Sequence, residues 1–217
     1  ISGTIGWFVL KSGRPAQDVV FWRCLFGAVT LVVVCAAFGL FKQRISPTKL
    51  ALAALGGVAI VVNWLLLFAA YPLASISIAT TVYNMQPFML VGLGALFLSE
   101  KVTVTKLSWL ALAFVGMILI VQSKPQASTV ASDYMMGILL SLGAAFFYAL
   151  AAIIAKQLKG TPPHLIALIQ VCVGVVMLAP FAKLSALPAS ASTWAPLVTL
   201  GVVHTGLMYI LLYGAIQ

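Results

Sequence analysis

Hydrophobic positions in this chain form long continuous runs, and the charged and turn-forming residues gather in short joints between them. A helix that spans a bilayer needs roughly 20 consecutive, mainly apolar residues. Because the apolar residues are continuous rather than alternating, the pattern predicts helices and not the strands of a barrel. Runs of suitable length cover residues 19–41, 50–70, 76–99, 105–123, 134–155, 164–182 and 195–216, and residues 1–10 have the pattern of the end of one more helix.

The composition places these helices in a membrane. The chain is 63% hydrophobic and 7% charged, whereas soluble domains contain roughly 25% charged residues. A water-soluble fold must cover its surface with polar groups, and this chain has too few of them. We therefore expect an all-α polytopic membrane protein with about eight helices in this chain and the lipid bilayer as its solvent.

The net charge of +9 does not indicate a nucleic-acid partner, because the basic residues lie almost entirely in the joints between apolar runs. The joints 42–49, 101–106 and 156–159 contain seven of the twelve Lys and Arg residues, and the remaining joints contain four. Cytoplasmic joints of membrane proteins carry an excess of Lys and Arg. This bias predicts that these three joints face the cytoplasm.

A weak internal repeat relates the two halves of the chain. Residues 56–70 align with residues 201–215 at an offset of 145, so that Trp64 corresponds to Tyr209. The repeating unit contains five helices, and an odd number of crossings inserts the second copy with inverted orientation. Inverted repeats are a common plan of secondary transporters, with the substrate near the membrane midplane between them.

The repeat predicts a division of the chain into two segments. Residues 1–123 contain the first five helices, the first of them truncated, and residues 134–217 contain helices six to eight of the second repeat. On this plan the native start precedes residue 1, and two further helices follow Gln217.

A signature lies between the fourth and fifth predicted helices. Residues 87–121 contain a proline, a glutamate followed by a basic residue, and a late glycine, here Pro87, Glu100, Lys101 and Gly116. Together with FWRCLFGAVTLVV at 21–33 and FFYALAAIIAK at 146–156, this segment resembles the EamA type of the drug/metabolite transporter superfamily. The resemblance implies a ten-helix carrier of small metabolites, built from two inverted five-helix repeats, in the inner (plasma) membrane of a bacterium. It points to the YddG-like branch, which includes exporters of aromatic amino acids.

The fourth predicted helix carries the richest polar face. Thr80, Tyr83, Asn84 and Pro87 fall at i, i+3, i+4 and i+7, which is one side of a helix. Pro87 has no backbone N–H, so it predicts a kink with an exposed carbonyl near Tyr83. This face is a candidate substrate site, and hydrogen bonding between helices is the alternative role.

Other polar or aromatic side chains at membrane depth are also candidates for binding the substrate, with helix packing as the alternative role of each. Arg23, about one turn inside the second predicted helix, has two interpretations, contact with a substrate carboxylate or snorkelling to the surface, and the second is preferred. Glu100 and Pro87 are candidate gating or hinge residues. The remaining substrate-binding candidates are Asn63, Trp64, Tyr148, His204 and Tyr209.

The function that these features favour is a secondary transporter that exports small metabolites, most simply amino acids, by alternating access. Asp18, Glu100 and Asp133 lie in joints or at helix ends, so coupling through a buried acid is disfavoured. No catalytic constellation, metal site or cofactor motif is visible, and we expect no enzyme activity. The alternatives are a nucleotide-sugar or cationic-drug transporter, an intramembrane enzyme or a non-transporting scaffold.

Overall fold

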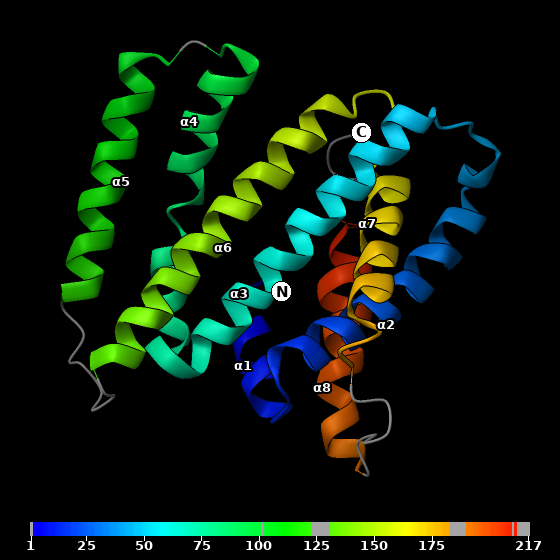
Figure 1. Ribbon diagram of the computed structural model, residues 1–217, viewed down its shortest axis with the longest axis horizontal. Coiled ribbons are helices and arrows are strands. Elements are labelled where there is room, and N and C mark those ends of the chain that lie inside the picture. The colour runs from blue at the N-terminus through cyan, green and yellow to red at the C-terminus, as the bar shows by residue number, and fades with distance from the viewer. Residues whose placement is uncertain (1, 101, 123–130, 183–189, 210, 212–217) are drawn as a thin grey trace. The chain divides into compact units, whose positions relative to one another are not determined.

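The computed structural model describes residues 2–100, 102–122, 131–182, 190–209 and 211, and in these residues every regular element is a helix. The predicted all-α fold is confirmed (Figure 1). Two short 3-10 turns, Ser2–Thr4 and Leu40–Lys42, and a π-helical segment, Val202–Leu207, accompany the α-helices. The helices are α1 Ile5–Lys11, α2 Ala16–Ala37, α3 Pro47–Tyr83, α4 Gln86–Leu98, α5 Val104–Gln122, α6 Ala131–Gln157, α7 Pro163–Leu178 and α8 Ala191–Gly201.

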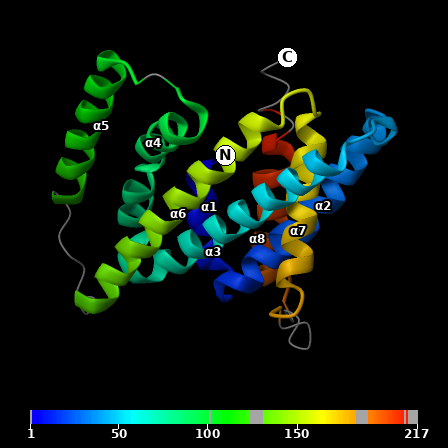
Figure 2. The same cartoon turned by 45° about the horizontal axis from the view of Figure 1, so that its top comes forward.

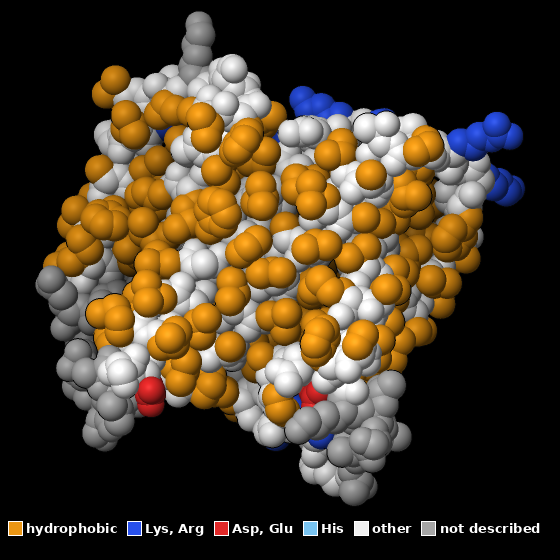
Figure 3. Space-filling model, viewed as in Figure 1, with side chains coloured by type: hydrophobic (Ala, Val, Ile, Leu, Met, Phe, Trp, Pro, Cys, Tyr) orange, Lys and Arg blue, Asp and Glu red, His pale blue; other side chains and the backbone are white. Residues whose placement is uncertain are grey.

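Several of these helices suit a bilayer. Among the described residues, Ala16–Ala37, Pro47–Tyr83 and Ser132–Gln157 are long and apolar enough to cross a membrane, and α4, α5 and α7 are shorter apolar helices. Hydrophobic side chains cover most of the visible faces of α3, α5 and α6 (Figure 3). Such a surface is stable in lipid, because lipid tails are as apolar as these side chains and the side chains need not be buried inside the protein.

The ends of α2 and α7 differ from the predicted runs for local reasons. The run 19–41 stops at Ala37, because Gly39 adopts a left-handed conformation with φ 64° and ends the helix in the usual way. The run 164–182 stops at Leu178, two residues before Pro180, which cannot continue a helix.

The predicted boundary between the helices 50–70 and 76–99 is confirmed by a sharp break at Ser75, although the two parts together make up the element α3. α3 continues from Pro47 to Tyr83 through a sharp break at Ser75, whose φ is 67°. The Ser75 hydroxyl accepts a hydrogen bond from the Ile78 N–H at 3.4 Å, so it caps the helical turns that follow. A second interruption separates Tyr83 from Gln86, close to the kink that Pro87 predicts.

The chain forms two compact units, which we describe separately. The first contains Ile1–Val61 and Ile154–Gln217, and the second contains Val62–Ile153. Each unit takes residues from both predicted segments, 1–123 and 134–217. The units therefore reflect packing in space, and the division into sequence repeats stays a prediction.

In the first unit, α2 packs against α7 and against α8 with its π-helical continuation, as both ribbon views show (Figures 1 and 2). Glycines bring these helices together. A Cβ on Gly174 of α7 would lie 2.5 Å from Cys24 Sγ, and a Cβ on Gly27 of α2 would lie 2.9 Å from Thr205 Cγ2. Small residues at such points let helix backbones approach closely.

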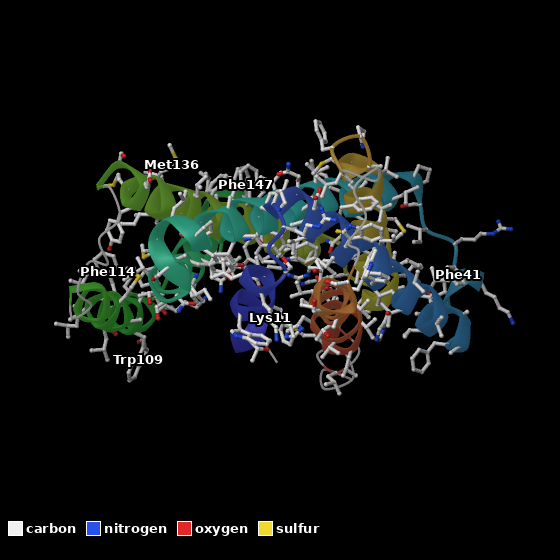
Figure 4. The ribbon with its side chains drawn as sticks, turned by 90° about the horizontal axis from the view of Figure 1, so that it is seen from below. Lys11, Phe41, Trp109, Phe114, Met136 and Phe147 are labelled. Atoms are coloured by element: carbon white, nitrogen blue, oxygen red, sulfur yellow. The ribbon has the colours of Figure 1, made fainter. Side chains whose placement is uncertain are left out.

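In the second unit, the C-terminal half of α3 packs against α6. Buried Ala74, Ile78 and Val82 contact Tyr134, Ile138 and Leu142. α4 and α5 lie side by side (Figures 1 and 2), and the rings of Phe88 and Phe114 are 5.9 Å apart. Trp109 of α5 is 67% exposed and points away from the neighbouring helices (Figure 4).

Candidate functional site

Three of the predicted substrate-binding residues come together in the second unit. Asn63 lies in the middle of α3 and is fully buried. Its Nδ2 donates hydrogen bonds to the Ala144 carbonyl of α6 at 2.7 Å and to the Tyr83 hydroxyl at 3.2 Å. The ring of Tyr83 meets the ring of Tyr148 edge to face, with centroids 6.0 Å apart. We call Asn63, Tyr83 and Tyr148 the asparagine–tyrosine cluster.

The helix break at Ser75 makes this cluster possible. Asn63 and Tyr83 belong to the same helix, 20 residues apart, and a straight helix would separate them by about 30 Å at 1.5 Å per residue. Because α3 changes direction at Ser75, its last turn comes back beside its middle. Gly137 of α6 lies close to this bend, where an added Cβ would be 2.9 Å from the Ala74 backbone nitrogen.

The cluster has chemistry to offer a polar ligand. The Asn63 Oδ1 atom is buried and has no hydrogen-bond partner among the described residues. A buried polar atom of this kind costs free energy, about 1–3 kcal/mol, unless a partner reaches it. The same side-chain amide is bonded to the Tyr83 hydroxyl, and the ring of Tyr83 meets that of Tyr148. The arrangement suits a ligand that brings a hydrogen-bond donor or an ammonium group.

The rest of the predicted face on the fourth helix is not continuous. The interruption between Tyr83 and Gln86 changes the helical register, so Thr80, Asn84 and Pro87 are exposed while Tyr83 is only partly so. The Asn84 N–H donates to the Thr80 and Thr81 carbonyls at 3.1 and 3.2 Å. The four residues therefore do not share one environment, although they were predicted on one side of a single helix.

Glu100 lies at the hinge between α4 and α5. Ser99 ends α4 with a left-handed φ of 51°, and the Glu100 N–H donates back to the Gly94 carbonyl at 3.2 Å, which satisfies one of the free carbonyls at the helix end. The Glu100 carboxylate folds over Gly94, where an added Cβ would be 3.0 Å from Oε2. This geometry gives Glu100 a structural position. Its predicted neighbour Lys101 lies outside the described residues.

His204 is held in the first unit by two side-chain contacts. Its Nε2 lies 2.8 Å from the Thr4 hydroxyl, and its Nδ1 lies 3.2 Å from the Thr199 carbonyl. A carbonyl only accepts hydrogen bonds, so Nδ1 carries the proton and, in the neutral ring, Nε2 accepts from Thr4. The ring of Phe8 packs on the imidazole at 5.2 Å. His204 is buried and has both nitrogens engaged in this conformation.

Arg23 joins the same region and does not snorkel. Its side chain is 4% exposed, and its Nε–H donates to the Thr205 hydroxyl at 2.9 Å. Its Nη2 lies 3.4 Å from the His204 carbonyl. The preferred prediction of a surface-seeking arginine is therefore wrong, because α8 and its π-helical continuation supply polar groups inside the unit.

The π-helical segment explains how Thr205 reaches Arg23. The Thr205 hydroxyl donates to the Leu200 carbonyl, five residues earlier, at 3.0 Å, which is the spacing of a π-turn. The hydroxyl then accepts from Arg23. Trp64 and Tyr209, the predicted repeat mates, lie in the second and first unit respectively, one buried and one partly buried.

Sequence reasoning missed several residues of these arrangements. Thr4 ends a 3-10 turn, Ser2–Thr4, that no periodicity marks. Ser75 could have been suspected from Pro72, three residues earlier in an otherwise apolar run. Gln86, by contrast, is visible in the sequence as a polar residue of the fourth predicted helix outside the Tyr83 face, and its Oε1 is buried with no partner among the described residues. No group of three or more metal-ligating side chains occurs in the part of the chain that the structure describes.

Comparisons with known proteins identify the kind of protein. A profile of the EamA-like transporter family matches residues 1–122 and 135–217. The "Uncharacterized transporter YxxF" of Bacillus subtilis (strain 168) is 31% identical over 220 residues, which cover all of this chain and 70% of that protein. A solved structure, described only as "Crystal structure of protein", is similar in fold, with a TM-score of 0.70 at 17% identity over 95% of this chain and 72% of its own. By these matches the chain belongs to the EamA-like transporter family, within the drug/metabolite transporter superfamily.

Proposed function

We propose that this membrane transporter exports amino acids by alternating access, with the asparagine–tyrosine cluster as part of the substrate site. Membership of the family implies a small-molecule substrate and a place in the bilayer. The observation that carries the finer proposal is the buried Asn63 Oδ1, in an amide that is bonded to Tyr83, whose ring meets that of Tyr148. An α-ammonium group donates hydrogen bonds and is attracted to aromatic faces. The proposal includes no chemical step and no cofactor.

Access to this site requires a conformational change. Asn63 is fully buried and its amide is bonded to Tyr83, so a substrate reaches Oδ1 only when the end of α3 moves. The bend at Ser75 and the interruption before Gln86 are the places where the helix direction changes, and hinges are commonly a few such residues. Movement there would open the cluster to one side of the membrane.

The repeat architecture is also part of the proposal. The family profile matches the chain twice, over residues 1–122 and 135–217, close to the predicted segments 1–123 and 134–217. Two matches to one family support an internal duplication. We propose that the protein lies in the inner (plasma) membrane of a bacterial cell as an inverted arrangement of five-helix repeats. In this arrangement the cytoplasm contains the joints 42–49, 101–106 and 156–159.

Counterflow in liposomes tests the proposal. The protein is reconstituted into vesicles preloaded with one unlabelled amino acid, and entry of the labelled form is followed across a panel of amino acids. Tyr83→Phe removes the hydroxyl that bonds Asn63 and keeps the ring, whereas Tyr148→Phe is the matched control. If Tyr83 positions Asn63 for the substrate, Tyr83→Phe raises the half-saturating concentration by about fivefold to tenfold, equivalent to about 1–1.4 kcal/mol, and Tyr148→Phe changes it less.

The outcomes separate the parts of the proposal. If Tyr83→Phe and Tyr148→Phe both exchange substrate like the unaltered protein, the carrier is kept and the cluster is discarded as the site, and Asn84→Ala then tests the exposed part of the predicted face. If no amino acid exchanges, amino acids are not the substrate, and nucleotide sugars and cationic drugs become the compounds to assay.

A further inference from the structure

Two loops that are far apart in the sequence meet at one end of the first unit. The Nζ of Lys49, at the start of α3, donates to the Lys159 carbonyl, between α6 and α7, at 3.2 Å. A Cβ added to Gly160 would lie 3.9 Å from the same Nζ. This contact joins the α2–α3 loop to the α6–α7 loop. Their basic residues, Lys42, Arg44, Lys49, Lys156 and Lys159, form what we call the basic loop patch.

The patch concentrates positive charge without an acid in its own loops. Residues 38–50 and 155–163 contain no Asp or Glu. Two helices also begin there, α3 at Pro47 and α7 at Pro163, and a helix N-terminus carries a partial positive charge. The Lys49 ammonium is partly stabilised by the Lys159 carbonyl, but Lys42 and Arg44 are exposed. Like charges gathered in this way repel one another unless anions lie between them.

Apolar side chains are exposed beside these cations. Phe38 is 65% exposed, Phe41 54% and Leu50 49%. Figure 4 labels Phe41 next to basic side chains that extend from the same end of α2, and Figure 3 shows these cations protruding beyond the hydrophobic surface. Exposed rings and cations together are typical of the boundary where acyl chains meet headgroups. The patch follows directly on the apolar helices α2 and α3, so it lies at that depth.

We propose that the basic loop patch binds the headgroups of anionic phospholipids in the leaflet at this end of the helices. The phosphate of such a lipid would lie among Lys42, Arg44 and Lys49, while its acyl chains contact Phe41 and the apolar sides of α2 and α3. A zwitterionic lipid offers the same phosphate but no net charge, so the patch discriminates against it. Basic clusters beside membrane helices bind anionic lipids in this manner.

Native mass spectrometry of the full chain in detergent measures this directly. The purified protein is titrated with dioleoylphosphatidylglycerol and, separately, with dioleoylphosphatidylcholine, which has the same acyl chains. The double variant Lys42→Gln/Arg44→Gln removes two positive charges from the patch, and both side chains are exposed. Each cation near a membrane surface contributes about a fivefold change in affinity, so the dissociation constant for phosphatidylglycerol rises by about 25-fold.

The matched control is Lys11→Gln/Lys106→Gln, which removes the same charge from two other joints. It leaves the phosphatidylglycerol affinity within about twofold if the patch is the site. In the unaltered protein, the preference for phosphatidylglycerol over phosphatidylcholine falls as ionic strength rises, because salt screens exposed charges. This last measurement needs no variant, so it holds even if a variant fails to fold.

Three results would overturn the proposal. Equal affinity for the two lipids would remove the role of net charge. An equal loss of affinity in the control variant would assign binding to the overall charge of the protein. If inorganic phosphate displaced phosphatidylglycerol completely, the acyl chains would contribute nothing to the affinity. The patch would then be a site for soluble anions.

Discussion

The close approach of α3 and α7 makes Gly57 the position at which the described packing is most directly tested. A Cβ at this residue would lie 2.9 Å from Gln170 Cα, 3.1 Å from Val173 Cβ and 3.2 Å from the Gln170 carbonyl oxygen. Two of these three atoms belong to the backbone of α7, so no side-chain rotation relieves the contact. Carbon atoms in favourable contact are about 3.5 Å apart or more, and Gly57→Ala must therefore separate the two helices by about 0.6 Å.

The expected size of the effect follows from two opposing terms. Adding a methyl group to a tightly packed contact costs about 1–3 kcal/mol. Replacing glycine by alanine inside a helix returns about 1 kcal/mol through backbone entropy. The net change is a loss of about 0–2 kcal/mol in the free energy of unfolding, which lowers the midpoint of thermal unfolding by up to roughly 8 °C for a chain of this size.

Gly92→Ala provides the matched control. Gly92 lies in α4, and a Cβ added there has no atom within 4 Å, so only the gain in helix propensity remains. Its unfolding midpoint stays equal to that of the unaltered protein or rises. Both variants are measured in the same detergent by circular dichroism at 222 nm, where α-helices give a strong negative signal that is lost on unfolding. A Gly57→Ala protein as stable as Gly92→Ala would refute the close approach of α3 and α7.

Two further substitutions test the polar contacts and the bend. Thr205→Val removes the hydroxyl that accepts from Arg23 and lowers the free energy of unfolding by about 1.5–3 kcal/mol, because the lost hydrogen bond involves a charged donor. Thr205→Ser keeps the hydroxyl and retains most of the stability in the same thermal assay. Equal losses in the two variants would show that the methyl group of Thr205, and not its hydroxyl, stabilises the protein. Ser75→Val places a β-branched residue at φ 67° and ψ 155°, a conformation that residues other than glycine rarely adopt, and costs about 1–3 kcal/mol. Ser75→Gly adopts that conformation without strain and is close to neutral. A stable Ser75→Val protein would mean that the bend is not located at this residue.

The helical fold could be predicted from the sequence because a single signal, apolar run length, determines it in a membrane protein. The positions of α2, α5, α6 and α7 follow the predicted runs within a few residues. The boundary between the runs 50–70 and 76–99 was also predicted at the place where α3 breaks, at Ser75, but the form of the break was not. Run length does not show whether Pro72 ends a helix or lies inside one, since neighbouring helices in a bilayer can satisfy the backbone groups that proline frees.

The candidate site was predicted in part. Asn63, Tyr83 and Tyr148 were chosen as polar or aromatic residues at membrane depth, and the structure brings these three together. The expected face of Thr80, Tyr83, Asn84 and Pro87 assumed an uninterrupted helix of 3.6 residues per turn, and the break before Gln86 invalidates that assumption. The partners of Arg23 could not be predicted, because a π-turn leaves no periodic signal in an apolar sequence.

The π-helical turn at Val202–Leu207 has a consequence for comparing this chain with its relatives. Such a turn is equivalent to one residue inserted into an α-helix, and each residue rotates an α-helix by about 100°. A homologue whose helix is regular here is therefore correctly aligned only with a one-residue gap inside a hydrophobic segment, where alignments are usually kept free of gaps. Without that gap, the position matched to Thr205 faces a different neighbour, and the residue that contacts the equivalent of Arg23 is misassigned.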